Sequence, residues 1–275
     1  MARPALGAAL EDGFNRRLIP FLRRRGWRPT TIAFTGYGSL ESLRVLARVL
    51  LTKDDDTATA DAGASGRELS EAEEAVRGWR SFVTAPVAYI PVTIEIGSRH
   101  YPVRADRGGY LDLLITDHGL PPGWHDITIR ARSAQPTTAR VLVIGPNTRT
   151  GVVSDIDDTV MVTRVPRPLV AAWNTFVRHT STRQAVPGMP EFFAGLEQTW
   201  PDAPVLYLST GAWNVVPTLE RFFRRHRLPS GPMLMTDWGP TNTGWFRSGQ
   251  EHKRTTLRRL LIDFPQVRWL LGGAA

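Results

Sequence analysis

The stretch GVVSDIDDTVMV, residues 151–162, decides the fold of the second half of the chain. Small and β-branched residues lead into three carboxylates, Asp155, Asp157 and Asp158, and apolar residues resume after Thr159. A short apolar run of this kind is typical of a parallel strand that is covered on both faces. We therefore expect a buried strand that ends in a cluster of charge, at the end where an open parallel sheet places its reactive groups.

The pattern around this stretch alternates between strand and helix. Three more apolar runs predict strands, PVLYLST (204–210), GPMLMTDWG (231–239) and QVRWLLGG (266–273). Helical periodicity lies between them, in residues 167–180, 187–201, 214–228 and 249–265. Alternation of this kind predicts βαβ units and a parallel sheet over residues 146–275.

The region before residue 146 has a different texture. Short β-rich runs separated by turn signals predict an antiparallel β-sandwich over residues 30–145. The runs are residues 44–51, 86–96, 110–115, 125–131 and 139–145. An acidic, turn-rich stretch at 54–66 reads as an insertion, and GPNTRTG (145–151) reads as the joint between the two domains.

Composition excludes several classes of protein. The chain of 275 residues has no cysteine, which excludes disulfide scaffolds, zinc–thiolate sites and a cysteine nucleophile. No run approaches the roughly 20 apolar residues that span a bilayer, and the start does not resemble a secretory signal. We expect a cytoplasmic protein. Its net charge of +8 reflects either arginine-biased coding or affinity for phosphate-bearing partners or membrane surfaces.

Residues 1–29 form a basic amphipathic segment in which apolar residues alternate with arginines and Pro20 interrupts any helix. Such a segment either lies on an anionic membrane surface or packs against the domain that follows it. We expect, at most, peripheral contact with a membrane. No nucleic-acid-binding motif accompanies the arginines, so we expect no nucleic-acid partner. Oligomeric state does not follow from the sequence.

The carboxylates after the first strand of the second half favour a metal site. Asp155 and Asp157 flank Ile156, and a turn there would aim both carboxylates into one crevice. Two such carboxylates repel each other, and a hard cation such as Mg²⁺ relieves the repulsion. An EF-hand loop starting at Asp155 is excluded, because Val160 stands at its glycine position. The alternative is an Asp-rich turn that caps a helix.

Two later positions add candidates for phosphate binding. Ser209 and Thr210 end a predicted strand, where a hydroxyl and backbone N–H groups would hold a phosphate oxygen, or where they would cap a helix. Lys253 opens a predicted helix and is one of only two lysines, the other being Lys53. A lysine is a compact charge suited to a phosphoryl group, although a helix lysine often only faces solvent.

These motifs, in this order, resemble the App1-type phosphatidate phosphatase family of the haloacid dehalogenase-like superfamily. The resemblance rests on four stretches, GVVSDIDDTVMVT with its D-x-D-x-T motif, LYLSTGAWNV, MLMTDWGPTNTGWFRSGQEHKRTTL and FPQVRWLLGG. It implies a fold with an N-terminal antiparallel β-sandwich domain and a C-terminal α/β haloacid dehalogenase-like domain with a Rossmann-like parallel sheet. It also implies a phosphoric monoester hydrolase that converts phosphatidate to diacylglycerol.

The resemblance implies a role for each candidate. Asp155 would be the nucleophile that forms an aspartyl-phosphate, and Asp157 the general acid and then base. Asp155 and Asp157 would bind Mg²⁺, the latter through its backbone carbonyl. Ser209 would hold the phosphoryl group, with Thr210 beside it, and Lys253 would neutralise the developing charge.

Two features leave the substrate and the activity open. Family members carry an acidic motif after the last strand, where this chain reads WLLGGAA, so we expect a truncated catalytic domain unless Asp158 or Asp237 substitutes. Residues 160–186 mix apolar residues with arginines, as a cap over a lipid phosphate would, or as a helix packed on the sheet would. The alternatives to phosphatidate are a soluble phosphomonoester and a catalytically silent membrane-binding or interaction module.

Overall fold

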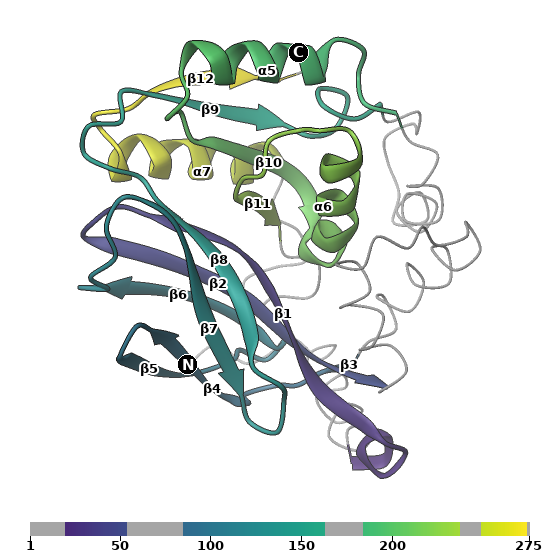
Figure 1. Ribbon diagram of the computed structural model, residues 1–275. Coiled ribbons are helices and arrows are strands. Elements are labelled where there is room, and N and C mark those ends of the chain that lie inside the picture. Colours follow the sequence, from purple (N-terminus) through teal and green to yellow (C-terminus); the bar gives the residue numbers. More distant parts are fainter. Residues whose placement is uncertain (1–19, 54–84, 163–183, 237–248, 274–275) are drawn as a thin grey trace. The chain divides into compact units, whose positions relative to one another are not determined.

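The computed structural model describes residues 20–53, 85–162, 184–236 and 249–273 (Figure 1). The chain divides into two compact units, and among the described residues the break falls between Val143 and Ile144. Several predicted features lie outside the described residues. They are most of the basic segment 1–29, the insertion 54–66, the helix 167–180 and most of the stretch 160–186.

The first unit is built from eight strands. They are β1 (Trp27–Gly38), β2 (Ser42–Lys53), β3 (Ala85–Pro86), β4 (Pro91–Ile96), β5 (Arg99–Arg104), β6 (Tyr110–Thr116), β7 (Gly123–Ala131) and β8 (Thr137–Val143). They form a single sheet in the order β3-β2-β1-β8-β7-β4-β5, with β6 paired to β2. The sheet is mixed, because β1 pairs parallel with β8 while its pairing with β2 is antiparallel.

One hydrophobic core serves this sheet. Burial alternates along β4, where Val92, Ile94 and Ile96 are buried and the residues between them are partly exposed. One cluster contains buried residues of β2, β4, β6, β7 and β8. A strand turns successive side chains to opposite faces, and these residues share one face of the sheet.

The predicted antiparallel β-sandwich is wrong. The strands form one continuous, curled sheet instead of two sheets packed face to face. The sequence analysis did not predict β1 or β5, and β1 is the strand that joins β2 on one side to β8 on the other. Without β1, the sheet would divide into two separate groups of strands, one containing β3, β2 and β6 and the other β8, β7, β4 and β5.

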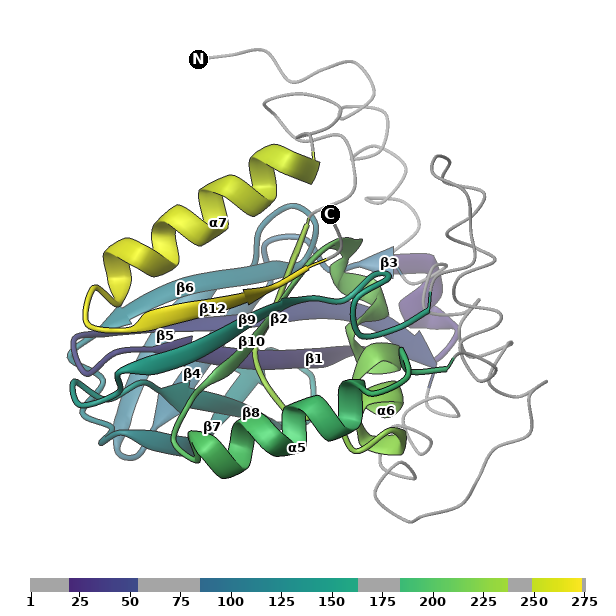
Figure 2. The ribbon, with the colours of Figure 1, turned by 90° about the horizontal axis from the view of Figure 1, so that it is seen from above.

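The second unit holds four short strands and three α-helices. The strands are β9 (Thr150–Asp155), β10 (Val205–Ala212), β11 (Met233–Thr236) and β12 (Arg268–Gly272). They pair in parallel in the order β11-β10-β9-β12. The helices are α5 (Met189–Thr199), α6 (Val216–Arg225) and α7 (Gly249–Asp263), and the 3-10 turn η3 (Trp213–Val215) precedes α6. Figure 2 shows α5 and α7 on opposite sides of these strands.

Aromatic residues pack the centre of this unit. The Tyr207 ring of β10 lies 4.4 Å from that of Phe223 in α6 and 6.1 Å from that of Phe193 in α5, measured between centroids. The Tyr207 hydroxyl donates to the Pro229 carbonyl at 2.8 Å. Rings tilted against each other at these distances add to the stability that their burial supplies. They hold β10 in place between two helices.

The predicted fold class is also wrong for the C-terminal half. The described residues are mostly strand, the largest element is the curled eight-stranded sheet, and within these residues there is no clear haloacid dehalogenase-like Rossmann domain. A strand such as β12 was expected to be covered on both faces, yet Leu271 is 65% exposed and Arg268 is exposed as well. β11 has only four residues. The helix predicted at 167–180 lies outside the described residues.

Among the described residues, no helix is long and apolar enough to cross a membrane.

Candidate functional site

The carboxyl end of β9 is shaped by a tight turn. The N–H groups of Val160 and Met161 both donate to the Ile156 carbonyl at 3.1 Å. Asp158 has a left-handed backbone, with φ of 57°, and its N–H donates to the Met161 carbonyl at 2.9 Å. Aspartate tolerates this conformation better than most residues, which suits it to the turn. The turn therefore fixes the backbone of Asp157 just beyond the strand.

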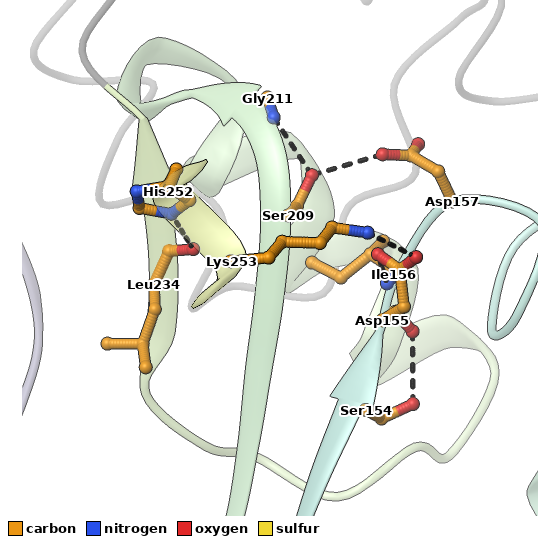
Figure 3. Close-up of polar contacts among 9 residues, drawn as sticks. All are labelled: Ser154, Asp155, Ile156, Asp157, Ser209, Gly211, Leu234, His252 and Lys253. Carbon is orange, nitrogen blue, oxygen red and sulfur yellow. Dashed lines mark hydrogen bonds and ion pairs between the residues drawn. The ribbon is translucent and has the colours of Figure 1, made fainter. Parts of the chain in front are cut away.

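Asp155, the last residue of β9, has both carboxylate oxygens bonded (Figure 3). Its Oδ1 accepts from the Ile156 N–H at 3.0 Å, and its Oδ2 lies 2.6 Å from the Lys253 Nζ. The Asp155 side chain is 15% exposed. A carboxylate with so little exposure to water needs partners for its oxygens, and a lysine ammonium and an N–H donor supply them here.

A hydrogen bond joins Asp157, just beyond the end of β9, to Ser209 within β10. The Ser209 hydroxyl of β10 donates to the Asp157 Oδ2 at 3.0 Å, and its oxygen accepts from the Gly211 N–H at 3.0 Å. Ser209 is 2% exposed. The parallel register that pairs Leu208 with Asp155 brings the two strand ends to the same edge of the sheet.

Lys253 reaches the site from the first turns of α7. The neighbouring residue His252 lies with its Nε2 3.3 Å from the Leu234 carbonyl of β11, as Figure 3 shows. This contact links the start of α7 to the edge strand of the sheet. Lys253 is 98 residues from Asp155 in sequence, and the placement of α7 brings their charged groups together.

The structure joins four of the five predicted site residues in two pairs, Asp155 with Lys253 and Asp157 with Ser209. Thr210 takes part through its backbone, since its carbonyl accepts a bond from the Thr236 hydroxyl at 2.7 Å. Sequence reasoning missed Thr236, Gly211 and His252. The strand-end argument that selected Ser209 would also have selected Thr236, because it is the last residue of β11.

The C-terminal half of the chain matches a known family. Residues 150–274 match the model described as "Phosphatidate phosphatase APP1, catalytic domain". This segment belongs to the App1-type family. The two pairs, Asp155 with Lys253 and Asp157 with Ser209, lie within the matched residues, and the match indicates that the App1-type domain is a phosphatase.

The other comparisons add little to this. No curated protein matches the chain. One similar solved structure is that of a carbohydrate acetylesterase from Xanthomonas citri, with 8% sequence identity and a TM-score of 0.25. The aligned region covers 86% of this chain and 65% of the esterase chain. A similarity of this degree supports no conclusion about fold or function.

The App1-type domain offers two carboxylates to a divalent cation. Mg²⁺ in phosphate-handling sites is held by one or two carboxylates, together with water and phosphate oxygens, and Asp155 and Asp157 fit that description by type and number. Within the described ranges, no three acidic or histidine side chains gather as a metal-binding group. Asp237, suggested as a further acid, lies outside those ranges, and the described contact of the Asp158 backbone is with Met161.

The carboxyl end of β12 reaches the same edge of the sheet. A Cβ built on Gly273 would lie 3.9 Å from the Asp155 Cβ. The strand end where an acidic residue was expected is therefore next to the proposed nucleophile, and its residue there is glycine.

Proposed function

We propose that this protein hydrolyses a phosphomonoester of the phosphatidate class through an aspartyl-phosphate on Asp155. The observation that carries the proposal is the 2.6 Å contact between Lys253 Nζ and Asp155 Oδ2, at a strand end within the App1-type domain. A charged, largely buried carboxylate paired with lysine is suited to attack phosphorus, because the lysine also balances the charge of the incoming phosphoryl group.

In the first proposed step, an Asp155 oxygen attacks the phosphorus and the bond from phosphorus to the ester oxygen breaks. The leaving alkoxide takes a proton from Asp157, which therefore enters the step protonated. Lys253 faces the three phosphoryl oxygens as charge spreads over them. Phosphoryl transfer needs mainly positioning and charge stabilisation, and this small group of residues supplies both.

In the second step, Asp157 removes a proton from water, and the resulting oxygen attacks the phosphorus of the aspartyl-phosphate. The bond from phosphorus to the Asp155 oxygen breaks, which releases inorganic phosphate and restores both aspartates. Asp157 thus gives a proton in one step and regains one in the next, so the cycle balances.

Ser209 links substrate binding to the state of Asp157. Without substrate, the Ser209 hydroxyl donates a hydrogen bond to Asp157 Oδ2. This bond favours the deprotonated form of Asp157, because a deprotonated carboxylate only accepts hydrogen bonds. When a phosphate oxygen competes for the Ser209 proton, the Asp157 oxygen is released to carry a proton itself. The exchange would prepare the general acid only when a phosphoryl group is present.

Mg²⁺ is the cofactor of the proposal, held by Asp155 and by Asp157. The ligands would be the Asp155 carboxylate and the Asp157 backbone carbonyl, which leaves the Asp157 carboxyl free to carry its proton. When bound, Mg²⁺ would balance the negative charge of Asp155 and of the phosphate.

The test is release of inorganic phosphate with and without Mg²⁺, comparing the protein with Asp155→Asn. The substrates are phosphatidate in mixed vesicles and a soluble aryl phosphate. Asp263→Asn is the matched control, because it removes the same charge from an exposed ion pair with Arg259 at the far end of α7. We expect Mg²⁺-dependent turnover of phosphatidate that Asp155→Asn abolishes and Asp263→Asn leaves unchanged.

Three other outcomes would each support a different conclusion. Turnover of the aryl phosphate without turnover or binding of phosphatidate vesicles would favour a soluble substrate. Activity that survives Asp155→Asn would overturn the assignment of the nucleophile. Vesicle binding without any phosphate release would favour the membrane-binding module.

A further inference from the structure

The pairing of β10 with β11 is interrupted at the site. Tyr207 and Leu208 pair with Met233 and Leu234, and the next pair is Ala212 with Thr236. Three residues of β10 therefore stand opposite a single residue of β11, and they are Ser209, Thr210 and Gly211. A bulge takes backbone carbonyls out of the regular ladder, and buried carbonyls need another donor.

Thr236 supplies that donor with its side chain. Its hydroxyl lies 2.7 Å from the Thr210 carbonyl oxygen and 3.1 Å from the Gly211 carbonyl oxygen. A hydroxyl has one proton, so the two carbonyls share it in a three-centre bond. The Thr236 hydroxyl thus replaces the backbone hydrogen bonds that the bulge interrupts.

The bond to the Thr210 carbonyl also fixes an N–H group. The Thr210 carbonyl and the Gly211 N–H belong to the same planar peptide unit and point in opposite directions. With its carbonyl held by Thr236, this peptide turns its N–H toward the Ser209 oxygen, where it donates at 3.0 Å. The Ser209 oxygen is then occupied as an acceptor, and its proton is directed to Asp157.

We propose that Thr236 is a positioning residue for the phosphoryl site, acting through the Thr210–Gly211 peptide on the Ser209 hydroxyl. Four groups form one polar chain, from the Thr236 hydroxyl through that peptide and Ser209 to the Asp157 carboxylate. Hydrogen bonds in series polarise one another, so loss of the first weakens the last. The role in catalysis rests on the proposed function, whereas the orientation of the peptide does not.

The test compares Thr236→Val, which keeps the shape and removes the hydroxyl, with Thr236→Ser, which keeps the hydroxyl. Thr199→Val is the matched control, because the Thr199 hydroxyl also donates to a carbonyl, that of Gly195 at 2.8 Å, on an exposed face of α5. Thermal unfolding identifies any variant that no longer folds. If Thr236→Val does not fold, Thr236→Ala replaces it.

The first readout needs no substrate. The backbone amide of Gly211 is followed by nuclear magnetic resonance in protein labelled with ¹⁵N-glycine, and its hydrogen exchange is measured. We expect Thr236→Val to shift this amide and to speed its exchange about tenfold or more, with Thr236→Ser close to the parent protein and Thr199→Val without effect.

The second readout is the affinity for inorganic phosphate in the presence of Mg²⁺, together with the separate values of kcat and KM. We expect Thr236→Val to bind phosphate about tenfold more weakly and to lower kcat/KM by a similar factor, with Thr236→Ser within about twofold of the parent protein.

An unchanged Gly211 amide in folded Thr236→Val would overturn the inference, and so would an equal loss in Thr236→Ser or in Thr199→Val. If the parent protein neither binds nor releases phosphate, the proposed function fails, and the Gly211 amide still decides whether Thr236 orients the peptide.

Discussion

The two units use ion pairs of similar length in different surroundings. In the first unit, the Arg44 Nε lies 2.7 Å from the Asp112 Oδ1 across β2 and β6, and Asp112 is 54% exposed. In the second unit, Lys253 lies 2.6 Å from Asp155, which is 15% exposed and ends a strand. Contact distance does not distinguish the two pairs, but burial and position along the strand do.

We expect the two ion pairs to have different roles. A pair whose carboxylate is half exposed adds little to stability, because water already solvates Asp112, although Arg44 is mostly buried. A carboxylate withdrawn from water at a strand end is costly to keep charged unless a cation and an N–H donor face it, and such an arrangement marks a candidate functional site. The predictions below test this contrast between the Arg44–Asp112 pair and the Asp155–Lys253 pair.

The largest effect is expected at Lys253. Lys253→Met leaves the Asp155 carboxylate facing only the Ile156 N–H and removes the charge that would stabilise the phosphoryl group, so kcat should fall by about 10²- to 10³-fold. Lys253→Arg should recover part of this, because a guanidinium keeps the charge and loses the compact geometry. Steady-state phosphate release measures both, and equal activity in Lys253→Met and the parent protein would remove lysine from the mechanism.

A smaller effect is expected at Ser209. Ser209→Ala removes one neutral donor from Asp157 and from the phosphoryl group, which should lower kcat/KM by about tenfold. The pH profile should change as well, because Asp157 loses the bond that favours its charged form. A profile identical to that of the parent protein would show that Ser209 does not act on Asp157.

The Arg44–Asp112 pair of the first unit should matter much less. Asp112→Ala should lower the free energy of unfolding by no more than about 1 kcal/mol and leave phosphate release unchanged. Arg44 keeps a second contact, with the Tyr37 hydroxyl at 3.3 Å. Urea unfolding and the phosphate assay on the same preparation check both statements, and a loss of activity would contradict the separation between the two pairs.

The smallest effect is expected at Glu220 of α6. Burial raises the pKa of this carboxyl, against the influence of Arg224 and Arg221. A folded-state pKa above the unfolded value of 4.5 means that folding favours the protonated form. The stability contributed is therefore complete below that value and is lost as the pH rises through the folded-state pKa.

Glu220→Gln removes that dependence. It should raise the unfolding midpoint at pH 7 by up to about 4 °C, with the difference shrinking as the pH falls toward 4. Thermal unfolding at several pH values measures it. A variant that is less stable than the parent protein at pH 7 would show that the charged form of Glu220 is stabilising.

Sequence reasoning reached the strand ends more securely than the fold. Asp155 and Ser209 were selected because they follow apolar runs, and Lys253 because it is one of two lysines and opens a helix. The structure places Lys253 in contact with Asp155 and Ser209 in contact with Asp157, while their roles stay predictions. Thr236 was missed because the strand was predicted over residues 231–239, whereas β11 ends at Thr236. Its partners, two carbonyls in a bulge, leave no trace in the sequence.

The fold class failed for a physical reason. Local patterns predict strands, but they do not say which strands pair, and pairing decides between one curled sheet and two packed sheets. β1 contains Pro29, Gly36 and Gly38, residues that argue against a strand, although it pairs along most of its length with β2. An exposed edge strand such as β12 cannot be told from a buried one by its short apolar run.

The most direct test of the account is to trap the proposed intermediate. The protein is mixed with excess phosphatidate and Mg²⁺, quenched during turnover and reduced with borohydride, which converts an aspartyl-phosphate to homoserine. Peptide mass spectrometry then locates the change. The account predicts homoserine at residue 155 in the parent protein and none in Asp155→Asn. Phosphate release without modification at Asp155, or with modification at another residue, would contradict it.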